Sequence, residues 1–413
     1  MLLVVCLVVN LLLVLKFRRF SSVELLSPWF WLWVGSLYHH VVGLCMYNSF
    51  YEQSPIPFTD HGLFAVNALS VYYCIFFTIT YLFNFGKIKG IEIIRPKEVR
   101  GSSLKIIAAA SVGLLATLVC VLVLVRHRDI LSSLYFFRTE VNAYYYESIF
   151  VPYRLGSILV VLMSLVFALF IMTRSYLWFI MFLPLLLLNF SMGNRSTVFS
   201  IALLLLFCCA LQRNRFMLFS AAGTLLLIPF MATYRYIYYD GSMRDILMLL
   251  GSESFSLYGH QIYTEHYASG LGSGVALIYK NIYNLFPSTI MYSLGVPYVE
   301  TFMGAIRPMY QNQYQVNFGM GGPLLSESLY YGGYLLAVST PLVIASCVWA
   351  CMRFLYYRNA ATLLYLLVFV TGIRSLFARL GFYENYLSDF YAVTVYGCVA
   401  MFLLWPYKVK VYE

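Results

Sequence analysis

Two residues in one region of the chain have the chemistry of a general base. Glu327 lies in the segment GMGGPLLSESLYYGG, residues 319–333, where apolar sequence resumes after a long polar stretch. His260 lies upstream in the sequence Tyr-Gly-His-Gln, and histidine is the side chain that changes charge near neutral pH. Either group would draw a proton from a weak nucleophile such as a hydroxyl. Both are therefore candidate catalytic residues.

Both candidates also have structural explanations. Ser326 and Glu327 would serve as the N-cap and first-turn acid of a helix, where negative charge favours the helix dipole. His260 would be an ordinary polar loop residue. The glycines of GMGG let the backbone pass close to a ligand, and a plain turn before a helix explains them equally well.

A set of arginines has the chemistry of a phosphate site. Guanidinium groups bind phosphate or diphosphate through two parallel hydrogen bonds. The alternative is that each arginine reaches the membrane interface or pairs with an acid such as Asp240, Glu384 or Asp389. The candidate diphosphate ligands are Arg195, Arg235, Arg307, Arg374 and Arg379.

Tyrosines are unusually dense in the same region, with twelve between Tyr236 and Tyr314. Aromatic belts at membrane interfaces explain part of this density. The remainder would offer flat amphipathic rings against sugar faces, which indicates a carbohydrate partner. The candidate sugar-binding residues are Tyr236, Tyr258, Tyr314 and Tyr330.

The elements that must position these residues are transmembrane helices. The 413 residues are 62% hydrophobic and 11% charged, a composition that excludes a soluble domain. A membrane-spanning helix needs about 20 mainly apolar residues, and the apolar runs are too long and continuous for barrel strands. We expect an all-α polytopic membrane protein of about eleven helices, near 1–15, 29–47, 61–85, 105–125, 153–173, 176–193, 196–212, 216–234, 326–352, 360–376 and 387–405.

The distribution of Lys and Arg sets the orientation. Basic residues fill the connections at 16–19, 87–105, 174, 213–215, 353–358 and 408–410, which therefore face the cytoplasm. The net charge of +10 is a topology signal and gives no indication of nucleic acid. The chain is expected to be one domain, 1–413, with residues 235–325 as a large outer loop. Residues 1–15 fit either a first transmembrane helix or a signal peptide. They lack the positively charged N-terminal region of a signal peptide, which favours the helix.

The nine cysteines fall in apolar spans, which favours packing over a disulfide framework or a metal site. Nucleotide-binding and metalloprotease motifs are absent from the sequence. We therefore expect metal-independent chemistry without a cofactor, on a substrate already activated within the membrane.

The large outer loop contains Phe286-Pro287, and these are followed by Gly322-Pro323, Glu327, Tyr330 and Gly332-Gly333. In this arrangement the chain resembles the bacterial oligosaccharide repeat-unit polymerases, the Wzy-type O-antigen polymerases. The Gly-Asn-Arg-Ser turn at 193–196 is also similar to that family. Members often have a dozen or more spans with the N-terminus inside, which differs from our count.

The resemblance implies a function in polysaccharide and lipopolysaccharide biosynthesis at the bacterial inner membrane. A growing glycan would pass from undecaprenyl diphosphate to a sugar hydroxyl of a lipid-linked repeat unit on the periplasmic face. The architecture would be similar to GT-C-type glycosyltransferases, and a partner protein would set chain length.

Two other functions share these features. A flippase for the same lipid-linked sugar would also need arginines and aromatic residues. It would be expected, however, to have charged residues deep within its spans and to have short outer loops. An O-antigen ligase would use the same donor with another acceptor, and an essential His260 would favour it. The long outer loop and nearly uncharged spans favour the polymerase.

Overall fold

The computed structural model is mainly helical over the residues that it describes. These are 90–94, 102–128, 146–150, 152–191, 195–212, 256–266, 292–295, 302–314, 324–356, 359–365, 367 and 390–412, with single helical positions at 8, 60, 68, 71, 72, 75 and 78. Among them, three helices are long and apolar enough to cross a membrane: Ser103–Arg126, Leu155–Thr173 and Leu324–Ser346. Shorter apolar helices occur at Tyr176–Asn189, Thr197–Gln212 and Thr394–Leu404.

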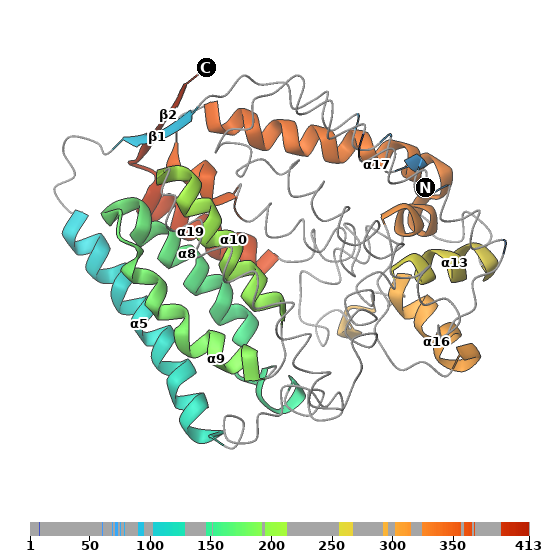
Figure 1. Cartoon of the computed structure of the whole chain (residues 1–413), viewed down its shortest axis with the longest axis horizontal. Helices are drawn as coiled ribbons and strands as arrows, with labels where there is room; N and C mark the ends of the chain where they lie inside the picture. The colour runs from blue at the N-terminus through green and yellow to red at the C-terminus, as the bar shows by residue number, and fades with distance from the viewer. Residues whose placement is uncertain are drawn as a thin grey trace.

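Helix α8 (Leu155–Thr173) is the centre of a bundle that includes α5 (Ser102–Arg126) and α19 (Phe390–Val399) (Figure 1). Every residue of α8 from Leu162 to Met172 is buried, and a helix buried on all sides belongs to the interior. Helix α5 instead exposes a row of leucines, including Leu114, Leu118 and Leu122. Such an apolar surface suits contact with lipid.

The segment after α8 forms a pair of neighbouring helices. The 3₁₀ helix η5 (Tyr176–Phe182) leads into α9 (Leu183–Ser191), and α10 (Arg195–Gln212) follows after a short connection. The hydroxyl of Thr197 donates to Asn189 Oδ1 at 2.9 Å, and both residues are buried. This bond joins α9 to α10 beside their connection, so the structure confirms helices on both sides of the expected turn.

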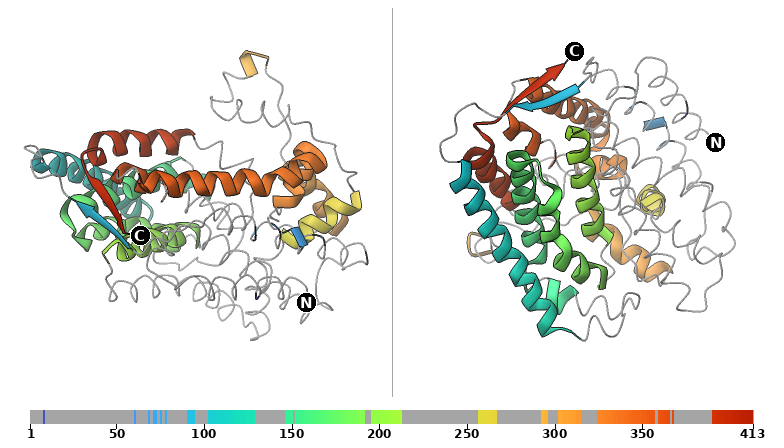
Figure 2. Two further views of the ribbon diagram at one scale, coloured as in Figure 1. Left: turned by 90° about the horizontal axis from the view of Figure 1, so that it is seen from above. Right: turned by 60° about the vertical axis from the view of Figure 1, so that its left-hand side comes forward.

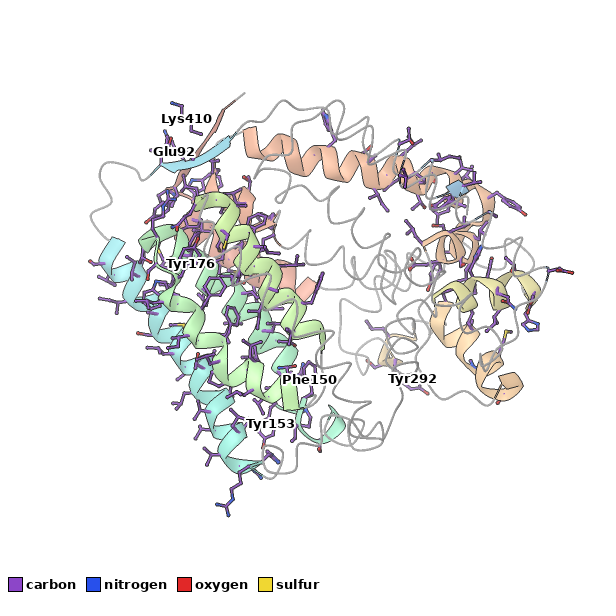
Figure 3. All side chains as sticks on the ribbon, viewed as in Figure 1. Glu92, Phe150, Tyr153, Tyr176, Tyr292 and Lys410 are labelled. Atoms are coloured by element: carbon purple, nitrogen blue, oxygen red, sulfur yellow. The ribbon has the colours of Figure 1, made fainter. Side chains whose placement is uncertain are left out.

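The π-helical turn η8 (Ala400–Leu404) continues α19 and leads to a small sheet. Strand β1 (Gly90–Ile94) pairs antiparallel with β2 (Lys408–Tyr412). Glu92 lies opposite Lys410 in the register, and both are exposed (Figure 3). Ile93 and Val409 lie on the opposite face of the sheet and are buried. The sheet was not expected from the sequence, although the alternation in Lys-Val-Lys-Val is typical of a half-buried strand.

The described parts of the connections at 87–105, 174 and 408–410, which the charge pattern assigns to one side of a membrane, meet at this sheet. The guanidinium of Arg174 donates to the carbonyl of Ile93, and the Gln212 amide donates to the carbonyl of Arg174 at 3.2 Å. The N–H of Ala360 donates to the carbonyl of Tyr407 at 2.9 Å. We call this region, defined by β1, β2 and Arg174, the basic end.

A second group of helices lies away from the α8 bundle (Figures 1 and 2). It contains α13 (Ser256–His266), α16 (Phe302–Tyr314) and the beginning of α17 (Leu324–Tyr356). All three helices contact one another, and α17 also contacts β2. Helices α13 and α16 both lie within residues 235–325, so the described part of the segment expected as an outer loop includes these two helices.

Helix α17 differs from the single span expected at 326–352. It begins at Leu324 and ends at Tyr356, and its backbone leaves the helical region at Gly332 and Gly333. We call residues 324–331 the short arm and residues 334–356 the long arm. The expected spans at 1–15, 29–47 and 216–234 lie almost wholly outside the described residues, so the count of eleven stays a prediction.

Candidate functional site

A buried polar cluster forms where α13 meets the short arm of α17. His260 of α13 is 1% exposed, and Ser326, Glu327 and Ser328 of the short arm are 0% exposed. Thr340 of the long arm is also 0% exposed. Polar side chains at such burial need compensating interactions, so their geometry is informative about the site.

His260 and Ser326 link the two helices of the cluster. The Nδ1 atom of His260 lies 2.5 Å from the Ser326 hydroxyl oxygen. Which of the two groups donates depends on the tautomer of the imidazole. Because Ser326 directly precedes Glu327 in the chain, the structure brings the two candidate bases into one cluster.

The same contact bears on the capping explanation of Ser326. Helix α17 begins at Leu324, so Ser326 is its third residue and does not occupy the N-cap position. Its hydroxyl contacts His260 of another helix. Glu327 does lie in the first turn of α17, and a favourable interaction with the helix dipole remains part of its environment.

Glu327 lies between two hydroxyl residues that point to different neighbours. Successive residues of an α-helix are rotated by about 100° around its axis. Ser326 contacts α13, whereas Ser328 contacts the long arm, with its hydroxyl 3.0 Å from that of Thr340. The carboxyl group of Glu327 therefore leaves the short arm from the sector between these two contacts. A carboxylate removed from water is unfavourable by several kcal/mol without compensation, and such groups concentrate at functional sites.

The contact between Ser328 and Thr340 shows that α17 folds back on itself. These residues are 12 positions apart, and a straight helix would separate them by about 18 Å. Each hydroxyl also lies 2.6 Å from the carbonyl oxygen four residues earlier and donates to it, Ser328 to Leu324 and Thr340 to Leu336. The two hydroxyls carry only two protons, which are therefore shared among the two carbonyl contacts and the contact between the hydroxyls.

The reversal depends on the glycine pair between the arms. Gly333 has φ 59° and ψ −154°, a region that is almost exclusive to glycine. A Cβ atom at Gly332 would lie 2.5 Å from the Cβ of Leu336. Both positions therefore need glycine, one for its dihedral angles and the other for the close approach of the arms.

Aromatic rings pack beside the polar cluster and join its three helices. Phe302, the first residue of α16, lies with its ring 5.6 Å from Tyr263 of α13 and 5.7 Å from Tyr330 of the short arm. The Phe302 N–H donates to the hydroxyl of Tyr331 at 3.3 Å. Phe302 and Tyr331 are buried, so these rings stabilise the group of helices that presents Glu327.

The sequence-predicted site residues are placed to different extents. Glu327 and His260 lie in the same buried cluster, and Tyr330 is partly buried one turn after Glu327. Arg195 begins α10, whereas Arg307, Tyr258 and Tyr314 lie on α16 or α13; the side chains of these four are not described. Arg235, Tyr236, Arg374 and Arg379 lie outside the described residues. The binding of diphosphate by the five arginines therefore stays a prediction.

Sequence reasoning did not assign functional roles to Ser328, Thr340 or the Gly332–Gly333 reversal. A signal was present, because a glycine pair inside an apolar run is unfavourable for a continuous helix. The Ser-Glu-Ser sequence before the pair is similarly unusual in an apolar span. The partner of Ser326 on α13 had no signal, because no local pattern relates residues so distant in sequence.

No protein-family model, curated protein or solved structure matches this chain.

Proposed function

We propose that the chain is a multi-pass glycosyltransferase of the bacterial inner membrane. It polymerises oligosaccharide repeat units carried on undecaprenyl diphosphate, with its site facing the periplasm. The observation that carries the proposal is the fully buried Glu327, held on the short arm of a broken apolar helix beside His260.

The reaction requires one proton to move and one bond to be exchanged. A sugar hydroxyl of the acceptor repeat unit attacks the anomeric carbon of the donor glycan. The bond from that carbon to the diphosphate oxygen breaks, and its electron pair leaves with the diphosphate. Glu327 takes the hydroxyl proton, a contribution of roughly 10² to 10⁴ in rate.

The leaving diphosphate needs its developing charge stabilised. The outer arginines named above have the right chemistry, because guanidinium groups bind phosphate oxygens in pairs. Aromatic residues, with Tyr330 the nearest to Glu327 along the short arm, supply flat surfaces for sugar rings.

The position of the cluster supports a site opposite the basic end. Helix α17 contacts β2, and the end of its long arm lies beside the sheet in Figure 1. Residues 334–356 of the long arm span roughly 34 Å at 1.5 Å per residue. That length matches a hydrocarbon core of about 30 Å. Positive connections face the cytoplasm, so a cluster at the other end of the long arm belongs on the periplasmic side.

One observation favours a second function, transport of the same lipid-linked oligosaccharide. Broken helices with polar residues at the break are typical of transporter binding sites, and α17 has this form. A ligase remains the third alternative, and it would assign the essential base to His260.

A glycan-length experiment separates the three functions. A bacterial host lacking this chain is compared with the same host regaining it, and surface glycans and lipid-linked intermediates are separated by size. Single-repeat glycans that become long chains on restoration support the polymerase. If the host that lacks the chain instead traps lipid-linked units inside the cell, the polymerase proposal is overturned in favour of a flippase. If that host makes long lipid-linked chains that never reach their surface acceptor, the chain is a ligase.

A further inference from the structure

We propose that His260 and Thr340 are positioning residues that orient the carboxyl group of Glu327 through its two chain neighbours. His260 acts on Ser326, and Thr340 acts on Ser328. The proposal rests on the proposed function in which Glu327 is the base, and it assigns His260 a role other than proton acceptor.

The two contacts hold the short arm from different directions. Ser326 is fixed by α13, a helix from a separate part of the chain, whereas Ser328 is fixed by the long arm of α17 itself. Because the two serines are rotated by about 200° from one another around the helix axis, they contact partners on nearly opposite sides of the short arm, and rotation of the arm in either sense moves both serines away from their partners. The direction in which Glu327 leaves the helix is therefore set.

His260 has a contact through which it can position Glu327. Its Nδ1 atom contacts Ser326, the residue that directly precedes Glu327 in the chain. A hydrogen bond at one imidazole nitrogen selects the tautomer and holds the ring plane. The contacted residue belongs to the same helical turn as Glu327, so an effect on the carboxylate follows from the backbone they share.

The two amide substitutions of histidine distinguish the roles. The side-chain amide of Asn reaches the position of Nδ1, whereas that of Gln reaches the position of Nε2, and neither is a base at neutral pH. His260→Asn keeps a partner for Ser326 and is expected to retain activity within about threefold. His260→Gln is expected to lose ten- to a hundredfold in kcat with KM for the lipid-linked donor unchanged, because misalignment of this size has such effects. Equal and complete loss in both variants would overturn the positioning role.

The second contact has its own matched pair of variants. Thr340→Val keeps the shape of the side chain and removes its hydroxyl, whereas Thr340→Ser keeps the hydroxyl. We expect Thr340→Val to lower kcat about tenfold, whereas Thr340→Ser should keep kcat close to the wild-type value. Wild-type kcat in Thr340→Val would overturn the role of this contact.

A covalent test of the reversal is independent of activity. A disulfide needs Cα atoms about 4.4 to 6.8 Å apart. A straight helix excludes this for Ser328 and Thr340, whereas folded-back arms with their hydroxyls 3.0 Å apart are compatible with it. The double variant Ser328→Cys, Thr340→Cys is oxidised in membranes, and the linked peptide is identified by mass spectrometry. Ser328→Cys with Val338→Cys is the control, because Val338 is 73% exposed on the long arm. Disulfide in the first pair alone supports the geometry; free thiols in both pairs would overturn it.

Failure of the proposed function can be distinguished from failure of this inference alone. Long polymer from Glu327→Gln would overturn the base role, and the positioning role would fall with it. An inactive Glu327→Gln together with fully active Thr340→Val and His260→Gln would overturn the positioning role alone. Protein level and thermal stability in detergent are measured for each variant, so loss of folding is separated from loss of alignment.

Discussion

The Nδ1 atom of His260 lies 2.5 Å from the hydroxyl of Ser326, a residue 66 positions further along the chain. This contact joins α13, which lies within the segment expected as an outer loop, to the first turns of α17. It also places the two candidate bases in a single buried cluster, with Glu327 on the short arm. Their roles must therefore be separated by substitutions that change one function of each side chain.

The Gly333→Ala substitution tests the reversal of α17 by its effect on stability. Alanine at φ 59° and ψ −154° is strained by about 1 to 3 kcal/mol, so the free energy of unfolding should fall by that amount. Thermal unfolding in detergent measures it. Gly156→Ala is the matched control, because the added Cβ meets only ordinary contacts at 3.7 Å. Equal stability of the two variants would contradict the backbone geometry at Gly333.

The buried bond between Asn189 and Thr197 should contribute to the packing of α9 against α10. Thr197→Val leaves the Asn189 oxygen without this donor and should destabilise the protein by about 1 to 3 kcal/mol. Thr197→Ser should keep most of the stability. A double-mutant cycle with Asn189→Leu should give a coupling energy of about 1 kcal/mol. A coupling energy near zero would argue against the bond.

Thiol labelling tests which side of the membrane each end faces. Tyr292 is 84% exposed within the expected outer loop, and Lys410 is exposed on β2 at the basic end (Figure 3). A membrane-impermeant thiol reagent should label Tyr292→Cys in cells with an opened outer membrane. It should label Lys410→Cys only after the inner membrane is also broken. The reverse order of labelling would invert the topology.

Charge-keeping substitutions test the recognition of diphosphate. Lysine keeps the positive charge of arginine but loses the two parallel hydrogen bonds of a guanidinium. We expect shorter glycans for lysine at those positions that bind diphosphate, among Arg195, Arg235, Arg307, Arg374 and Arg379. Glycan length on a sizing gel is the measurement. Full polymer length with lysine at all five positions would rule out paired recognition.

Parts of the fold could be predicted because the physical cause is local. Helices α5, α8 and α10 match the apolar runs at 105–125, 153–173 and 196–212, since burying backbone polar groups away from water requires helices. The pairing of β1 with β2 was missed, because the strands end and begin at Ile94 and Lys408, far apart in the sequence. The length of an apolar run carries no information on which strands pair. The meeting of the connections at 87–105, 174 and 408–410 at that sheet agrees with the prediction, made from their charge, that they share one side of the membrane.

The candidate site could be predicted only in part for the same reason. Glu327 stands out because a carboxylate beside an apolar run is unfavourable. The partnership of Ser326 with His260, and of Ser328 with Thr340, depends on how α13 packs and where α17 reverses. Both are tertiary features that no periodic pattern encodes. The arginines and most of the tyrosines of the predicted site stay predictions.

The most direct test of the central claim is the glycan-length distribution made by Glu327→Gln. Glutamine keeps the shape of the side chain and removes its basicity, so we predict single-repeat glycans with the protein at its normal level in the membrane. Glu92→Gln is the matched control, because Glu92 is an exposed residue of the sheet at the basic end, and it should make polymer of normal length. Polymer of normal length from Glu327→Gln would contradict the account.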